Sequence, residues 1–525
     1  MDTFSEQRNN NNWKKKHSNP EGQKKHRQER QGAHRVIGKG KSNVNGADQK
    51  KLIQDIQLRT VKILNILLIT AAFAIAWYGY YAARVDIPYY RKGNWLIIFI
   101  FLLLYLFLGI TYDAFLISYY RISEMIYSQA LSALASDVIL YILCMLLSKT
   151  LPRVWPMLLT YALQLGIAAV WSLVSHRWYF RHFKAKKTFI VWDMRRGMTK
   201  LIESYGLNQK FHVVGNCSAK ECVENLSVLD GMSVVFLTGV HSHDRNTIIK
   251  YCVDKNITTF VVPRIGDVMM SGAKKMHLFH LPMLRLTRYN PSPEFLFFKR
   301  LFDIVFSLLA LAVFSPVMLV IAVLIKREDG GPVFYRQIRL TKNGKEFVML
   351  KFRSMCVNAE KDGKARLSTG ENDSRITRIG RKIRSVRMDE LPQFINILKG
   401  DMSFVGPRPE RPQIAREYEK DLPEFRLRLQ AKCGLTGYAQ VYGKYNTTPY
   451  DKLQMDLMYI ASPSLAQDFM ILIATVKILF LKESTEGVAE GQTTASFQKP
   501  ERSVKEETDV QTQHIAEEAE QKHNI

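Results

Sequence analysis

Two adjacent carboxylates, Asp389 and Glu390, directly follow a strongly basic stretch of this chain. Such a pair can supply a nucleophile, because carboxylates form covalent acyl phosphates in some phosphoryl-transfer enzymes. It can also supply a metal ligand, since Mg²⁺ prefers oxygen atoms and takes one or two carboxylates together with substrate phosphates. An acidic pair alone more often marks a solvated helix end, so the neighbouring sequence has to decide.

The residues around the acidic pair favour phosphate binding. Six of the thirteen residues from Arg375 to Arg387 are basic. Apolar residues recur there with helical spacing at Ile376, Ile379, Ile383 and Val386. This pattern predicts a basic amphipathic helix, which either lies on anionic lipid headgroups or packs on a protein core. Residues 406–409, Gly-Pro-Arg-Pro, form a rigid turn that presents Arg408, and a guanidinium suits bidentate phosphate contacts.

The stretch from about 295 to 485 resembles the bacterial sugar transferase family, the monotopic phosphoglycosyl transferases. The matching motifs are KRLFD, Ser315-Pro316, KFRSM, RMDELPQFINILKGDMSFVGPRPE, GLTGYAQVYGKYN and DLMYI with SLAQD after it. One departure is Cys433, where many members have proline. Members of this family initiate exopolysaccharide, capsule or O-antigen assembly on undecaprenyl phosphate.

The resemblance implies a role for each matching residue. Asp389 would attack the sugar-proximal phosphate of a UDP-sugar, UMP would leave, and undecaprenyl phosphate would then take the phosphosugar from Asp389. Glu390 would bind Mg²⁺. Phosphates would be held by Lys351, Arg353, Arg384, Arg408 and Pro409. Ser315 and Pro316 would form the break of a re-entrant membrane helix.

Four apolar runs precede this region and predict transmembrane helices. Each is close to the ~20 residues that a hydrocarbon core of ~30 Å requires. They extend over Ile63–Ala83, Trp95–Tyr112, Tyr127–Leu147 and Trp155–Ser175. Asp137 lies inside the third run, where we expect a hydrogen bond between helices rather than a functional carboxylate.

Lysine and arginine orient these helices. Residues 1–56 are basic and lack an apolar segment, which predicts a disordered cytoplasmic tail rather than a signal peptide. Residues 177–187, after the fourth run, are also basic, so both ends of the bundle should face the cytoplasm. The net charge of +26 is therefore better explained by topology and lipid contact than by nucleic-acid binding.

Residues 299–326 form a further apolar stretch that Ser315 and Pro316 interrupt. Proline inside a helix removes one backbone hydrogen bond and bends the chain. A fifth span would place all later residues outside the cell, whereas a re-entrant hairpin would return them to the cytoplasm. Basic residues flank both ends of the stretch, which favours the hairpin. The Ser315 hydroxyl could then satisfy a carbonyl that the break frees.

The region between 185 and 290 alternates short β-rich runs with helical stretches, which predicts a Rossmann-like parallel sheet. Its first turn, residues 191–197, keeps only Gly197 of a dinucleotide-binding fingerprint, so we expect a structural or regulatory module. Four scattered histidines are expected at the surface: His241, His243, His277 and His280. Six cysteines in 525 residues are too few for a disulfide scaffold.

The sequence therefore predicts an α+β membrane protein, and the resemblance implies that it lies in the bacterial inner membrane. It would contain four transmembrane helices at 57–180, a Rossmann-like module at 185–290, a mainly helical catalytic domain at 295–485 facing the cytoplasm, and a disordered tail at 486–525. The resemblance implies a UDP-sugar, undecaprenyl phosphate and membrane lipids as partners. The sequence also allows a homodimer, and we expect no nucleic-acid partner. The competing hypotheses are a catalytically silent scaffold, a basic nucleic-acid-binding protein, and a multi-span phosphoglycosyl transferase. No residue identifies the sugar.

Overall fold

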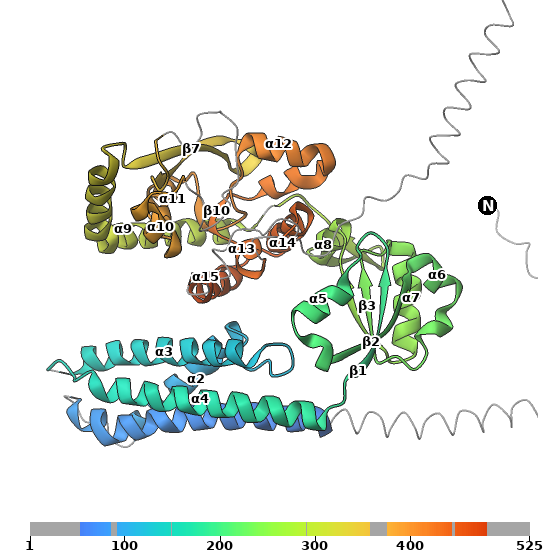
Figure 1. Cartoon of the computed structure of the whole chain (residues 1–525), viewed down its shortest axis with the longest axis horizontal. Helices are drawn as coiled ribbons and strands as arrows, with labels where there is room; N and C mark the ends of the chain where they lie inside the picture. Colours follow the sequence, from blue (N-terminus) through green and yellow to red (C-terminus); the bar gives the residue numbers. More distant parts are fainter. Residues whose placement is uncertain are drawn as a thin grey trace, which may run out of the picture.

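The computed structural model describes residues 53–85, 92–148, 150–289, 291–357, 375–443 and 447–479. Three units follow one another along the chain: a bundle of long helices, a parallel sheet covered by helices, and a mixed unit of helices and short strands (Figure 1). The predicted tail at 486–525 lies outside the described residues, and so does most of the tail at 1–56. Residues 53–56 are instead the start of the first long helix.

The first unit contains the long apolar helices that the four apolar runs predict. They extend over Ile53–Arg84, α2 at Lys92–Thr111, α3 at Ile122–Leu147 and α4 at Trp155–His182. Together with α9, described below, they make five helices among the described residues that are long and apolar enough to cross a membrane. Such helices fit a membrane protein.

Polar side chains join the four helices inside the bundle. The Asn65 amide donates to Gln129 Oε1 at 3.0 Å, and the Tyr105 hydroxyl donates to Asn65 Oδ1 at 3.0 Å. Gln129 in turn donates to Ser172 Oγ of α4 at 3.2 Å. Buried Asp137 accepts from Gln164 of α4 at 3.4 Å, which is the interhelical hydrogen bond predicted for it.

The second unit is a sheet of four parallel strands in the order β2-β1-β3-β4, as the alternating pattern predicts (Figure 1). Its elements are β1 (Lys186–Trp192), α5 (Met198–Ser204), β2 (Phe211–Ser218), α6 (Ala219–Glu224), β3 (Val234–Thr238), α7 (Ser242–Asp254), β4 (Thr258–Val262) and α8 (Ile265–Ser271). Val191 and Val235 pack with α6 and α7, whereas Ile190 and Val234 pack with α5, so both faces of the sheet are covered.

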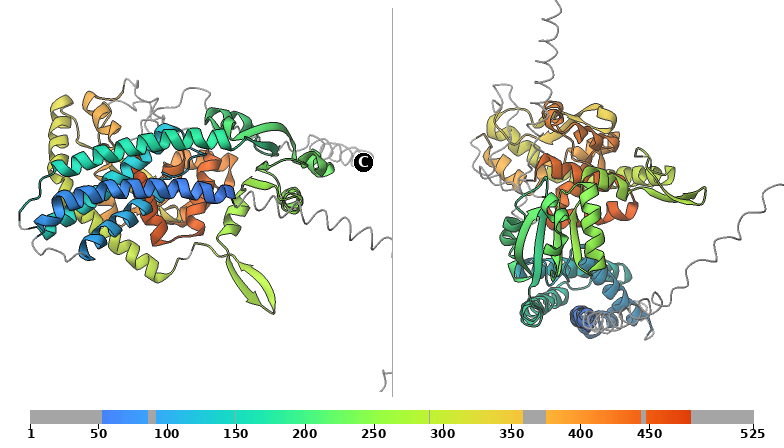
Figure 2. Two further views of the ribbon diagram at one scale, coloured as in Figure 1. Left: turned by 90° about the horizontal axis from the view of Figure 1, so that it is seen from below. Right: turned by 90° about the vertical axis from the view of Figure 1, so that its right-hand side faces the viewer.

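A two-stranded hairpin follows, formed by β5 (Lys274–Leu278) and β6 (Leu281–Arg285), and it projects from the rest of the molecule (Figure 2). The four histidines singled out in the sequence, two of them in this hairpin, are exposed as expected. The imidazole Nδ1 of His241 contacts the carboxylate of Asp193.

Helix α9 (Pro293–Asp329) is one continuous helix that contains Pro316 and bends along its length (Figure 1). Proline at this position leaves the carbonyl of Ala312, four residues earlier, without its usual N–H donor. The Ser315 hydroxyl donates to that carbonyl at 2.9 Å, as the sequence predicts. Most apolar side chains of α9 are exposed, which suits contact with lipid.

The remaining elements form the third unit. They are β7 (Phe334–Leu340), β8 (Glu346–Phe352), α10 (Arg378–Ser385), α11 (Gln393–Lys399), β9 (Ser403–Val405), α12 (Pro412–Asp421), β10 (Gly434–Thr436), α13 (Tyr438–Tyr442), α14 (Pro449–Ala461) and α15 (Leu465–Leu479). Strands β7 and β8 pair antiparallel, and β9 pairs parallel with β10.

The KRLFD motif attaches α9 to this unit. Lys299 forms an ion pair with Asp468 of α15, and Arg300 donates to the carbonyls of Ile397 and Leu398 at the end of α11. Buried Asp303 accepts from Ser403 Oγ and from the Phe404 N–H, both at 3.0 Å. The motif therefore fixes the direction in which α9 leaves the third unit.

The basic amphipathic helix is shorter than predicted, because α10 covers only Arg378–Ser385. Ile383 is buried and packs with Ile379 against α9 and β8 residues, whereas Val386 is exposed. The apolar face of α10 therefore packs on the protein core. Of the two alternatives drawn from the sequence, the structure supports packing on the core for this face.

Candidate active site

Asp389 and Glu390 lie on a single helical turn, Met388–Glu390, between α10 and α11. The residue before this turn, Arg387, has a left-handed backbone with φ of 57°. This conformation follows α10 and redirects the chain, so that the Glu390 carboxylate meets Lys351 of β8 and Arg408 of the Gly-Pro-Arg-Pro turn. Asp389 is 8% exposed.

Glu390 is held by two cations from distant parts of the chain. Its Oε1 lies 2.8 Å from Lys351 Nζ of β8 and 3.2 Å from Arg408 Nη2. Burial alone would raise the pKa of Glu390, but the charges of Lys351 and Arg408 outweigh it and hold that pKa well below its ordinary value. Glu390 is therefore ionised across the physiological pH range.

Asp389 has a different environment. Among the residues that the structure describes, no side chain donates to its carboxylate. Burial and the neighbouring charge of Glu390 raise the pKa of Asp389, while Lys351, Arg384 and Arg387 oppose the rise. The pair thus combines one carboxylate engaged by cations with one that is left available, which is the arrangement a carboxylate nucleophile needs.

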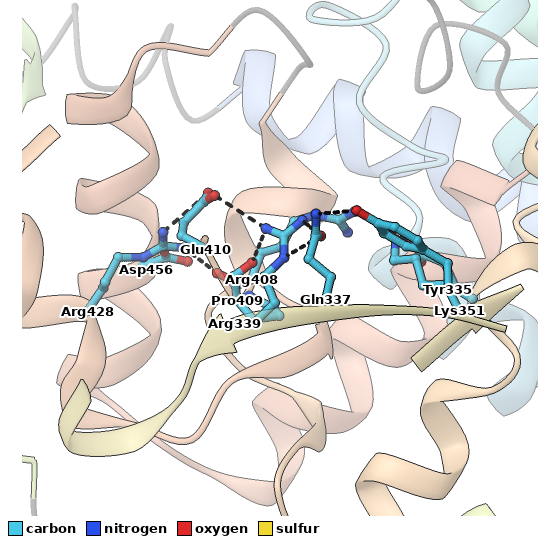
Figure 3. A network of polar contacts seen from close by, with 10 residues as sticks. Tyr335, Gln337, Arg339, Lys351, Arg408, Pro409, Glu410, Arg428 and Asp456 are labelled. Carbon is cyan, nitrogen blue, oxygen red and sulfur yellow. Dashed lines mark hydrogen bonds and ion pairs between the residues drawn. The ribbon is translucent and has the colours of Figure 1, made fainter. Parts of the chain in front are cut away.

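The turn that carries Arg408 and Pro409 is built on close backbone contacts. Gly406 lies against the backbone of Lys432 and Gly434, and a Cβ would have no room there. The Arg408 guanidinium points along β7 toward Lys351 (Figure 3). Pro409 contributes its carbonyl, which accepts from Arg339 at 2.9 Å, so its contact is with the protein.

The structure places the other two predicted phosphate ligands differently. Arg384 of α10 belongs to the positive surroundings of Asp389. Arg353 is buried and forms an ion pair with Asp329 at the end of α9. Lys351, Arg384 and Arg408 are therefore brought together around the acidic pair, whereas the Arg353 side chain is engaged at the end of α9.

The acidic pair fits a Mg²⁺ ion that takes most of its ligands from substrate. Among the described residues, no group of three or more His, Cys, Asp or Glu could hold a metal. Mg²⁺ is, however, usually bound through one or two carboxylates together with substrate phosphates and water. Both cations contact Glu390 through Oε1, so Oε2 and the Asp389 carboxylate are the oxygens that the protein can offer.

Comparison with known proteins adds independent evidence. The profile described as bacterial sugar transferase matches residues 295–482. A putative undecaprenyl-phosphate N-acetylgalactosaminyl 1-phosphate transferase of Bacillus subtilis (strain 168) is 42% identical over 164 residues, which cover 30% of this chain and 90% of that protein. The chain belongs to the bacterial sugar transferase family.

Other sugar transferases are similar over a longer segment. The UDP-N-acetylgalactosamine-undecaprenyl-phosphate N-acetylgalactosaminephosphotransferase of Aeromonas hydrophila is 38% identical over 231 residues, 43% of this chain and 53% of that protein. The UDP-glucose:undecaprenyl-phosphate glucose-1-phosphate transferase of Klebsiella pneumoniae is 41% identical over 234 residues, 44% of this chain and 48% of that protein. The chain spans about half the length of these two relatives.

Sequence reasoning missed a second set of charged residues next to the turn that carries Arg408. Arg428 and Asp456 are almost completely buried and lie beside Glu410 and Arg339 (Figure 3). One signal was available. Asp456 falls on the apolar stripe of α14 with Leu453 and Leu457, where a carboxylate requires a partner.

Proposed function

We propose that this sugar transferase moves a sugar 1-phosphate from a UDP-sugar to undecaprenyl phosphate and thereby initiates exopolysaccharide or capsule synthesis. The observation that carries the proposal is the difference within the acidic pair. Asp389 has no hydrogen-bond donor from a side chain of the described residues, whereas Glu390 contacts two cations. The names of the relatives support the lipid acceptor, since they act on undecaprenyl phosphate.

The reaction has two displacements at one phosphorus atom. An Asp389 carboxylate oxygen attacks the phosphorus next to the sugar, forming an acyl phosphate bond, while the bond from that phosphorus to the bridging oxygen breaks and UMP leaves with that oxygen. A phosphate oxygen of undecaprenyl phosphate then attacks the same phosphorus and releases Asp389. The product is an undecaprenyl diphosphosugar, and the two-step scheme predicts ping-pong kinetics.

The cations of the site suit this chemistry. Lys351 and Arg408 lie within contact distance of Glu390, next to Asp389, so they can neutralise charge on phosphate oxygens that approach Asp389. Arg384 adds positive charge from α10. When bound through Glu390, Mg²⁺ would supply further charge neutralisation at the phosphates.

The proposal includes a re-entrant arrangement for α9. The helix contains Pro316, and basic residues flank its apolar stretch, namely Lys299 and Arg300 before and Lys326 and Arg327 after. Both ends of α9 would then face the cytoplasm, together with both ends of the four-helix bundle. Nucleotide sugars are cytoplasmic, so the catalytic domain would meet its soluble substrate and the lipid phosphate at the inner leaflet.

UMP release tests the proposal. Full-length protein in lipid nanodiscs is given undecaprenyl phosphate, Mg²⁺ and, in separate reactions, UDP-glucose, UDP-galactose and the two N-acetylated UDP-hexosamines. We expect UMP release with one of these sugars and a loss of at least about 10³-fold in the Asp389→Asn variant, because the nucleophile is removed. Exchange of labelled UMP into the UDP-sugar without lipid would identify the first displacement.

A catalytically silent scaffold is the alternative function. A scaffold would release no UMP with any sugar, and cells carrying Asp389→Asn would still make the polysaccharide. Release of UMP by the wild type, together with loss of polysaccharide in the variant cells, excludes the scaffold.

A further inference from the structure

Two arginines, the buried Arg428 and the half-buried Arg339, donate to the backbone of the turn that carries Arg408. Arg428 Nη2 donates to the carbonyl of Arg408 at 2.9 Å. Arg339 Nη1 donates to the next carbonyl, that of Pro409, also at 2.9 Å (Figure 3). Neither arginine needs to touch a substrate, since both act on the backbone from which the Arg408 guanidinium extends.

Arg428 is itself fixed by two carboxylates. Its Nη2 lies 2.7 Å from Asp456 Oδ2, and its Nη1 lies 3.4 Å from Glu410 Oε1. Arg428 is 3% exposed and Asp456 is 1% exposed. A guanidinium presents several N–H donors in a fixed plane, whereas a lysine presents a single ammonium group.

Burial of the Asp456 carboxyl opposes its charged form. Burial raises the pKa of Asp456 to about 6, even though Arg428 and Lys452 favour its charged form and Glu410 alone opposes it among the nearby charges. Because the folded-state pKa is raised, the stability contribution of this carboxyl is largest at low pH and is lost as pH rises through about 6. Buried ion pairs in general are weak evidence for stability.

Asp456 stands on a helix that is fixed at its other end. Near the start of α14, Asp451 forms an ion pair with Arg195, which follows β1 of the sheet module. Gln454 of α14 donates to the carbonyl of Pro263, which follows β4. The carboxylate of Asp456 is therefore presented from a rigid element rather than from a loop.

We infer that Arg428, held by Asp456, is a positioning residue that fixes the backbone of Arg408 and so aims its guanidinium at Glu390 and the substrate phosphates. The inference rests on the proposed function. Without Arg428, the carbonyl of Arg408 loses its donor and the peptide can rotate. A displacement of about 1 Å at the guanidinium is enough to slow a reaction by up to about 100-fold.

A double-mutant cycle tests the inference. UMP release is measured for the wild type, Arg428→Lys, Arg408→Lys and the double variant, all as full-length protein in nanodiscs. We expect Arg428→Lys to be about 10- to 100-fold slower than the wild type. If Arg428 acts through Arg408, adding Arg428→Lys to Arg408→Lys should lower the rate of UMP release by no more than about threefold. The guanidinium that Arg428 positions is already absent from the Arg408→Lys variant.

A loss that is merely structural gives a different result. Partial misfolding lowers the rate by the same factor in both backgrounds, so effects that multiply in the double variant would overturn the inference. An unchanged rate in Arg428→Lys would overturn it as well. Arg426→Lys is the matched control, because Arg426 is exposed on the same 3₁₀ segment, Pro423–Gln430, and should keep the wild-type rate.

Two further readouts keep the test decisive. If Arg428→Lys does not fold, as judged by its thermal unfolding midpoint, Asp456→Asn is measured in the same cycle, with the same coupling to Arg408→Lys expected. If the wild type releases no UMP with any sugar, the proposed function fails and the inference fails with it. If the wild type releases UMP but the effects of the two substitutions multiply, the proposed function stands and only the inference fails.

Discussion

Asp389 and Glu390 are neighbours in the chain, yet their surroundings shift their pKa values in opposite directions. Two cations stabilise the charge of Glu390, while burial and the charge of Glu390 itself disfavour the charge of Asp389. A pair of carboxylates separated in this way can divide the work of a reaction, one as nucleophile and one as ligand. The division depends on Lys351, which faces both residues.

Replacing Lys351 should therefore change the pH dependence of the reaction. Asp389 must be ionised to attack, so kcat/KM should fall at low pH as Asp389 becomes protonated. Lys351 lowers the pKa of Asp389, and its loss should raise that pKa. We expect Lys351→Met to move the acid limb of the UMP-release profile to higher pH and to lower the rate at neutral pH. Lys345→Met, exposed at the turn between β7 and β8, is the control; a limb that stays in place or moves down would contradict the assignment.

The sequence could indicate this site only where its residues are contiguous. Asp389, Glu390 and Arg408 lie within a single stretch whose composition already suggests phosphate chemistry. Arg428 and Asp456 lie far along the chain and meet only in the folded core, because the pairing depends on how α14 packs against the 3₁₀ segment at Pro423–Gln430. No local pattern encodes such a contact.

At the level of elements, α9 has a long apolar surface and contains a proline, and the carbonyl that this proline leaves without a donor is hydrogen-bonded within the helix. Thirty-seven residues of helix would measure about 55 Å if straight, well above the ~30 Å hydrocarbon core. The Ser315 hydroxyl replaces the donor that Pro316 lacks, so the bend leaves no unpaired carbonyl at Ala312 in an apolar environment. Both the proline and the hydroxyl that replaces its missing donor are therefore supplied by the sequence of the helix itself.

The membrane arrangement of α9 can be tested by labelling both of its ends. Single cysteines are introduced as Glu294→Cys and Arg327→Cys in a Cys356→Ser background, since Cys356 is the exposed native cysteine among the described residues. We expect both to react with an impermeant maleimide in inside-out vesicles and neither in right-side-out vesicles. Opposite labelling of the two ends would show a true span. Leu151→Cys, between α3 and α4, should label from the outside and controls for vesicle orientation.

At the scale of the whole molecule, the sheet module contacts the third unit through the edge that binds ligands in many open α/β sheets. Ligands in such sheets lie beyond the carboxyl ends of the strands, where the strand order reverses. Here that point lies between β1 and β3, and Arg195, which follows β1, is occupied by Asp451 of α14. The module is thus connected to the catalytic unit at the position where a Rossmann fold would hold a nucleotide.

Breaking this contact should loosen the two units from each other. Arg195 and Asp451 form a largely buried pair, so Arg195→Met and Asp451→Asn should each lower the thermal unfolding midpoint. In a cycle with the double variant we expect a coupling of about 0.5–3 kcal/mol. Arg196→Met, next in sequence and stacked on Trp192, tests whether loss of any arginine in this loop has the same effect. Additive effects of the first two variants would mean that the pair does not hold the units together.

The sequence indicates the three units well, because each has its own periodicity: long apolar runs in the bundle, short β-rich runs in the module, and mixed amphipathic segments afterwards. It does not indicate the contacts between them. Those depend on single side chains such as Arg195 and Gln454, whose partners lie about 190 residues or more away. The helix predicted over residues 375–387 is also longer than α10, which ends at Ser385. The left-handed backbone at Arg387 has no signature in a basic run of sequence.

The attachment of α9 by Asp303 has a consequence for insertions and deletions. Pro316 lies 13 positions after Asp303, which corresponds to about 20 Å of helix and about three and a half turns. One residue added between them would shift the bend by only about 1.5 Å but would rotate it by about 100° around the helix axis. The second half of α9 would then leave in a different direction relative to the catalytic unit. The number of residues between Asp303 and Pro316 therefore determines the direction in which the second half of α9 leaves. An insertion of a whole turn should be tolerated better than an insertion of one residue, because it restores that direction.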